Sequence, residues 1–88
     1  MTKDQVELQA RLMAIENMVS MLFASEYISS GWSIEKVQAL HQQLIHQAQR
    51  ETFPNVGAAF SDHFAGEYEE NVARLLRAVE EKMAARSR

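Results

Sequence analysis

The segment from residue 3 to residue 29 is apolar on two sides when it is drawn as an α-helix, and this property constrains the fold more than any other. Residues spaced alternately three and four apart share one side of a helix. A first stripe follows this spacing, and a second stripe lies across the helix from it: Leu8, Leu12, Ile15, Val19 and Leu22, and Val6, Ala10, Ala14, Met21 and Ile28. Such a helix needs apolar neighbours on both sides.

One chain has too little material to provide those neighbours. A helix of roughly 27 residues is about 40 Å long, whereas a compact chain of 88 residues has a radius of gyration of about 12 Å. We therefore expect a homodimer, a bundle in which this helix packs against a second copy of itself. The expected interface consists of Leu8, Leu12, Ile15, Met18, Val19, Met21, Leu22 and Ile28.

Local signals divide the chain into three helices, at about 3–29, 34–50 and 58–84. Thr2 and Gln5 have the spacing of a capping box, Gly31 is suited to a helix stop, and Ser33 is a good N-cap. Pro54 interrupts the pattern after the second helix. The cap of the third helix stays open between Asn55 and Ser61. The prediction is a single all-α domain covering residues 1–88.

Composition narrows the functional classes. The chain has no cysteine, which excludes disulfides and thiolate chemistry and suits a cytoplasmic location. No apolar run approaches the roughly 20 residues that a membrane helix needs, and the N-terminal residues do not resemble a signal peptide. We expect no membrane association.

The three histidines do not form a recognisable metal or catalytic motif. His41 and His46 are five residues apart, which places them on different sides of a helix. His63 shares a face with Glu67 and Glu70, a pattern more typical of a solvated row of charges. His41 lies on the apolar face of its helix and is expected to be a buried, hydrogen-bonded histidine. We predict no catalytic residue, no metal site and no cofactor, hence no enzyme.

The leading functional prediction is a small interaction or adaptor protein acting as a homodimer. Its grooves would receive a protein helix or a small apolar ligand. Six side chains are expected to line them: Met18, Phe23, Tyr27, Trp32, His41 and Phe53. One alternative is a DNA-binding regulator that uses the helix at 34–50, although the net charge of −3 makes nucleic acid an unfavourable partner. A second is a bundle that binds a ligand or metal through His41 or His63.

Overall fold

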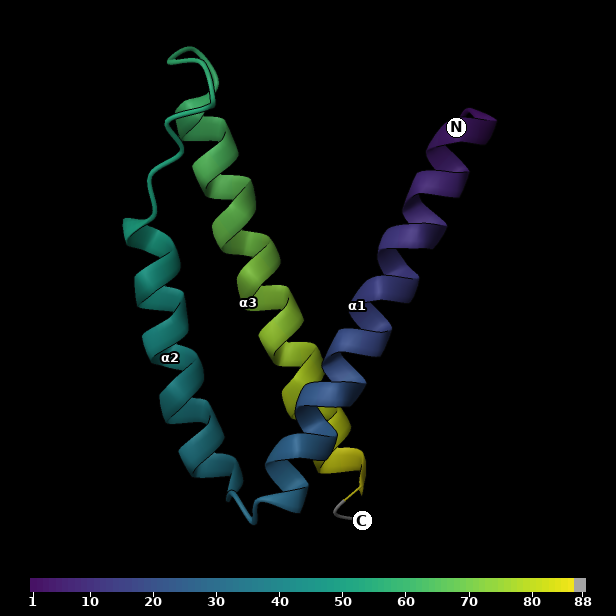
Figure 1. Cartoon of the computed structure of the whole chain (residues 1–88), viewed down its shortest axis with the longest axis vertical. Helices are drawn as coiled ribbons and strands as arrows, with labels where there is room; N and C mark the ends of the chain where they lie inside the picture. The colour runs from purple at the N-terminus through teal and green to yellow at the C-terminus, as the bar shows by residue number, and fades with distance from the viewer. Residues whose placement is uncertain (87–88) are drawn as a thin grey trace.

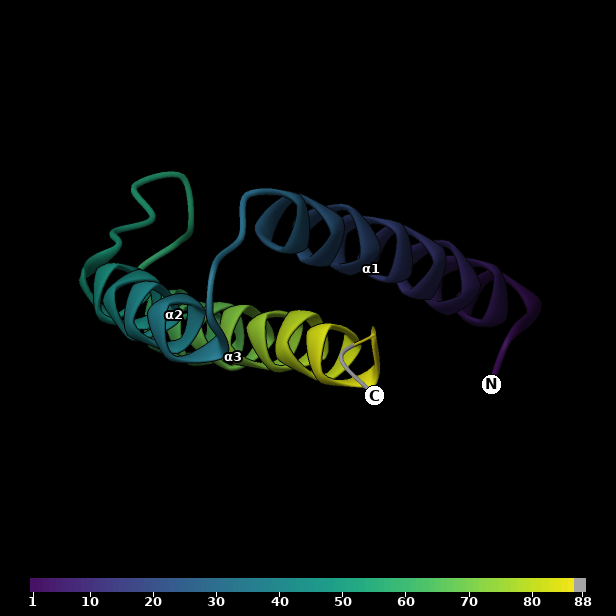
Figure 2. The ribbon, with the colours of Figure 1, turned by 90° about the horizontal axis from the view of Figure 1, so that it is seen from below.

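The computed structural model describes residues 1–86, which form three α-helices in a V-shaped arrangement (Figure 1). The helices are α1 (Lys3–Ser29), α2 (Ile34–Arg50) and α3 (Ser61–Arg86). α2 and α3 lie side by side and run in opposite directions in one layer, while α1 occupies a second layer (Figure 2). The all-α prediction is confirmed, and the first two helices have the predicted bounds. The third begins at Ser61 rather than near residue 58, and it ends at Arg86 rather than 84.

The ends of α1 and α2 follow from local hydrogen bonds. The Oγ1 of Thr2 accepts from the backbone N–H of Gln5, while the Gln5 side chain accepts from the backbone N–H of Thr2, so the capping box is complete. Ser33 caps α2 by accepting from the N–H of Lys36. Gly31 has φ of +74°, a conformation that costs other residues more. These contacts fix a short, sharp turn between α1 and α2.

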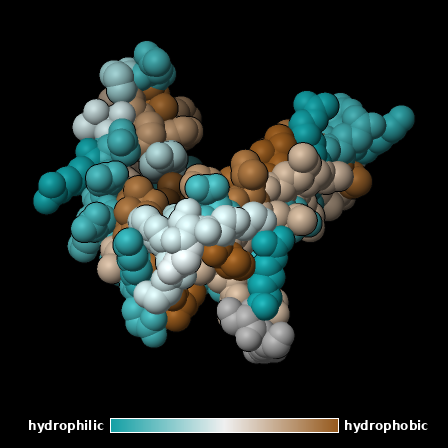
Figure 3. Space-filling model, turned by 60° about the horizontal axis from the view of Figure 1, so that its bottom comes forward, coloured by the Kyte–Doolittle hydropathy of each residue, from teal (hydrophilic) through white to brown (hydrophobic). Residues whose placement is uncertain are grey.

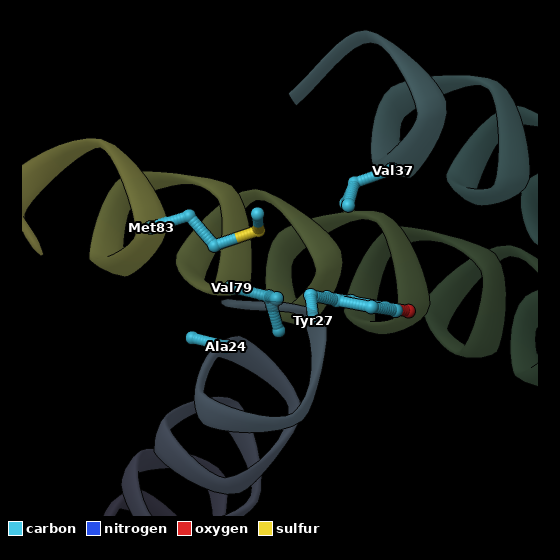
Figure 4. Packing of buried hydrophobic residues seen from close by; sticks show 5 residues of the cluster. All are labelled: Ala24, Tyr27, Val37, Val79 and Met83. Carbon is cyan, nitrogen blue, oxygen red and sulfur yellow. The ribbon is translucent and has the colours of Figure 1, made fainter. Parts of the chain in front are cut away.

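The helices meet at one end of the molecule, which we call the apex. It contains the C-terminal end of α1, the N-terminal end of α2 and the C-terminal end of α3 (Figure 1). Side chains from all three helices point toward one another here (Figure 4). The buried cluster consists of Ala24, Tyr27, Val37, Val79 and Met83, with Trp32, Ile34 and Leu40 packed against it. The hydrophobic core is therefore small and lies at the point of the V.

The buried residues of α1 belong to neither of its two apolar stripes. Its buried residues are Ser20, Ala24 and Tyr27, which lie between the stripes. Ser20 and Ala24 are small and one helical turn apart, so the backbone of α1 can approach α3 closely at this crossing. The Ser20 hydroxyl donates to the Asn17 carbonyl within its own helix, which satisfies a group that is only 1% exposed. Apart from Val19, which is partly buried, the residues of both stripes stay exposed.

An aromatic contact supports the end of the α2–α3 pair that lies away from the apex. Phe53, in the segment after α2, meets the rings of Phe64 and Tyr68 at centroid distances of 4.8 and 5.1 Å, both edge-on. The connection then turns through a hydrogen bond from the Phe60 N–H to the Gly57 carbonyl. This turn accounts for the late start of α3. Within residues 1–86, none of the helices is long and apolar enough to cross a membrane.

The crossing at Ala24 generates a prediction about stability. Ala24→Leu inserts a larger side chain where the residue is fully buried, so the free energy of unfolding should fall by about 1–3 kcal/mol. Ala39→Leu makes the same change on the exposed side of α2 and should alter it by less than about 0.5 kcal/mol. Urea unfolding followed by circular dichroism measures both variants. Equal effects would contradict the tight crossing.

Candidate functional site

The candidate site is the surface of α1, because this helix exposes apolar side chains along almost its whole length. Every residue from 1 to 15 is exposed. In the first stripe, Leu8, Leu12 and Ile15 are 54%, 49% and 51% exposed, Leu22 is 72% exposed, and Val19 is partly buried. Figure 3 shows hydrophobic side chains gathered along the arm that α1 forms. The first stripe is thus an accessible row rather than part of the core.

The second stripe is also exposed. Val6, Met21 and Ile28 have exposed fractions of 51%, 47% and 40%, and Met18, between the two stripes, reaches 71%. Isolated apolar residues are common on protein surfaces, but contiguous rows of them mark interaction sites. The predicted interface residues therefore lie together on one helix, on two of its sides.

The molecule as a whole exposes more surface than a compact chain of its mass. A globular protein of 10.0 kDa exposes about 5,200 Å². This chain exposes 6961 Å², an excess of about 1,700 Å². Its radius of gyration is 15.4 Å, against about 12 Å for a compact chain of this length. The extra surface follows from the V, since α1 diverges from α3 above the apex (Figure 1).

Within residues 1–86, an ion pair links α1 to α3 at a point between the apex and the free end of α1. The guanidinium of Arg74 donates two hydrogen bonds to the carboxylate of Glu16, at 2.6 and 2.7 Å, and a third to the Asn71 side chain. The hydrogen bonds to Glu16 and its negative charge raise the pKa of Arg74 above its usual value. Glu70 lies one turn away from Arg74 on α3, at a spacing that can also form an ion pair. The structure pairs Arg74 with a residue on another helix instead.

The residues predicted to line a groove come together only in part. Tyr27 lies beside three of them, with ring centroids 6.2 Å from Phe23, 5.4 Å from Trp32 and 5.7 Å from His41. Burial raises the pKa of the Tyr27 hydroxyl. Phe53 does not join this group, because it packs against α3 at the other end of α2. Of the residues predicted to line grooves, Phe53 thus lies apart from the group around Tyr27.

An open hollow lies beside this aromatic group. It has a volume of about 550 Å³ and is bounded by the turn after α1 and the end of α3, through Ile28, Gly31, Trp32, Ser33, Ile34, Met83 and Ala84. Ligand pockets usually enclose most of the surface of the molecule they bind. This hollow is broad and open, so it does not favour a small apolar ligand over a protein surface.

His41 is buried, as its place on the apolar face predicted, and is 2% exposed. Its Nδ1 lies 2.8 Å from the Oε2 of Glu80 on α3. Since a carboxylate only accepts, Nδ1 donates this hydrogen bond. The buried Nε2 has no hydrogen-bond partner. The pair connects α2 to α3 next to the core, and we interpret it as a structural contact.

The other histidines occupy exposed positions. His46 lies on the outer side of α2 and His63 near the start of α3. Within the described part of the chain, no group of three or more histidine and acidic side chains is arranged to hold a metal ion. The exposed side of α2, which the DNA-binding alternative would use, carries Glu35 near its start, and Gln49 is already hydrogen-bonded to Glu69. These surroundings do not favour contact with phosphates.

Comparison with known proteins adds no family. No protein-family model, no curated protein and no solved structure matches this chain. The surface of α1 therefore has to be interpreted from its own residues.

The buried contact between His41 and Glu80 leads to a second prediction. His41→Ala removes a buried ring and its hydrogen bond, and should lower the free energy of unfolding by about 2 kcal/mol. His46→Ala, on the exposed side of the same helix, should change it by less than about 0.5 kcal/mol. A double-mutant cycle with Glu80→Ala should give a coupling of about 0.5–1.5 kcal/mol. A coupling of zero would mean that the two side chains do not interact.

Proposed function

We propose that the protein is a non-enzymatic helical interaction protein that acts as a homodimer through α1. The observation that carries this proposal is the exposed first stripe, whose five aliphatic residues repeat at the spacing of a helix-packing surface. Burying a stripe of this kind against another apolar helix surface lowers the free energy, because it removes apolar area from water. A second copy supplies an identical stripe without requiring any other molecule.

The exposed area supports a second copy as the occupant. Specific protein interfaces bury about 1,200–2,000 Å² in total, and obligate homodimers bury about 2,000–5,000 Å². An excess of about 1,700 Å² on each chain amounts to about 3,400 Å² for two chains, which lies in the homodimer range. The chain therefore has enough uncovered surface for a stable dimer.

The energy available suggests that the first stripe alone gives a modest affinity. Fully burying an aliphatic side chain contributes about 1.5–3 kcal/mol, and these residues are already about half covered. Ten such side chains from two copies then contribute on the order of 10 kcal/mol. Loss of free motion on association costs about 4–15 kcal/mol. Further contacts, from the second stripe or the hollow beside Trp32, would have to supply the remainder of a tight complex.

The alternatives rest on weaker support. DNA binding through α2 would require more cations than Lys36 and Arg50, which stand beside exposed Glu35. Ligand or metal binding through His41 would require an accessible ring nitrogen. A mobility shift at low salt, where electrostatic binding is strongest, tests the DNA alternative directly. Binding that weakens steeply with added salt would replace the present proposal with that one.

Self-association predicts the molecular mass of the protein in solution, and it predicts that a charge in the first stripe returns this mass to that of one chain. Light scattering at tens of micromolar should give twice the chain mass of 10.0 kDa. Leu12→Asp places a charge in the middle of the first stripe and should return the single-chain mass, because burying an unpaired carboxylate is costly. Gln43→Asp adds the same charge on the exposed side of α2 and should leave the dimer intact. A wild-type monomer throughout this range would refute the proposal.

Association should also protect the free half of α1. Residues 6–15 are exposed in the single chain, and an isolated helix of this length is marginal in water. Their amide hydrogens should therefore exchange more slowly as protein concentration rises, whereas amides near Ala24 at the apex should change little. Hydrogen exchange followed by mass spectrometry at two concentrations measures this. Exchange in residues 6–15 that is independent of concentration would contradict it.

A further inference from the structure

We infer that the second copy binds with its α1 parallel to the first and in register, as in a two-stranded coiled coil. This inference rests on the proposed self-association and specifies its geometry. It draws on three observations: the heptad positions of the first stripe, the side chains that flank it, and the position in which Arg74 holds Glu16.

The first stripe fits the a and d positions of a heptad repeat. Leu8, Ile15 and Leu22 are seven residues apart and take position d, while Leu12 and Val19 take position a between them. The in-chain contact of α1 lies on a different side of the helix, at Ser20 and its neighbours, so α3 does not block the stripe. The heptad surface is available for a partner helix from residue 8 to residue 22.

The flanking residues distinguish the two possible directions of that partner. In a parallel, in-register pair, each g residue faces the e residue five positions later on the other chain. Arg11 and Met18 occupy g positions, and Glu16 and Phe23 occupy the corresponding e positions. Arg11 would thus face Glu16 of the partner subunit, and Met18 would face Phe23 of the partner subunit. Met18 and Phe23 are 71% and 49% exposed, so both are accessible for that contact.

Antiparallel pairing forms no such ion pair. One antiparallel register that keeps the stripes in contact places Arg11 beside Met18 of the partner subunit and Glu16 beside Gln9 of the partner subunit. The other register brings Glu16 against Glu16 of the partner subunit, and like charges repel. Complementary flanking charges are the usual means by which coiled coils select an orientation.

The contact with α3 prepares Glu16 for this role. Arg74 donates to both oxygens of the Glu16 carboxylate, which holds the side chain in one position on α1. Each carboxylate oxygen has two acceptor sites, so Glu16 retains capacity for a second arginine. Its side chain is 30% exposed, which leaves it reachable from solvent. Glu16 can therefore accept from Arg74 of its own chain and from Arg11 of the partner subunit together.

One residue opposes the parallel arrangement. Glu26 occupies the next a position and would meet Glu26 of the partner subunit. It lies in the last turn of α1, is exposed, and has the Ser30 hydroxyl 3.4 Å from its carboxylate. Water at the end of the helix screens this single repulsion. The two Arg11–Glu16 pairs and the two Met18–Phe23 contacts outweigh it.

Disulfide trapping tests the direction cleanly because the chain has no cysteine of its own. Leu8→Cys and Leu22→Cys are made separately and oxidised under mild conditions. In a parallel dimer each new thiol faces the same thiol of the partner subunit, so both variants should give a covalent dimer on a non-reducing gel. Gln42→Cys, on the exposed side of α2, is the matched control and should remain single. Circular dichroism before oxidation checks that the helices are retained.

The outcomes separate this inference from the proposed function. A dimeric mass without trapping at either position would overturn the parallel arrangement, and trapping in a mixture of Leu22→Cys with Gln5→Cys or Leu12→Cys would establish an antiparallel one. A monomeric mass would overturn self-association itself.

A charge reversal adds a second readout. Arg11→Glu should raise the dissociation constant about tenfold, because two attractive pairs become repulsive. Lys3→Glu makes the same change of charge on the opposite side of α1 from the heptad surface and should have little effect. Equal effects of the two reversals would remove the Arg11–Glu16 contact from the interface and contradict the parallel pairing.

Discussion

The structure depends on a close crossing in which the last third of α1 is held against α3. Ser20 and Ala24 are small enough for the two helices to approach, and Tyr27 closes the contact against the core. Above this crossing the Glu16–Arg74 pair is the ion pair that links the two helices within residues 1–86. Because the attachment is confined to one end, the remainder of α1 projects away from the chain (Figure 1), and its apolar residues stay exposed.

Much of the fold followed from local signals. The capping residues Thr2 and Ser33 and the turn at Gly31 act over a few positions, so the bounds of α1 and α2 were predicted correctly. The start of α3 was less accurate, because the turn between Gly57 and Phe60 competes with a helix and local propensity does not decide between them. Local patterns fix where helices begin and end when the stop is strong.

Tertiary contacts were harder to foresee. Periodicity identified two apolar sides of α1, yet the chain packs through Ser20 and Ala24, which hydrophobicity alone does not mark as contact residues. Phe53 was named with Tyr27 among the groove residues, but it follows the end of α2, where no helical pattern indicates that it packs on Phe64 and Tyr68. The Glu16–Arg74 pair joins residues 58 positions apart, and no pattern within one helix could have indicated it.

The distance between the first stripe and the core has a consequence for how sequences of this kind can diverge. Leu8, Leu12 and Ile15 are absent from the buried cluster at the apex, so substitutions at these positions escape most of the selection that preserves folding. In the proposed dimer, such substitutions would alter the pairing surface and leave the scaffold at the apex intact.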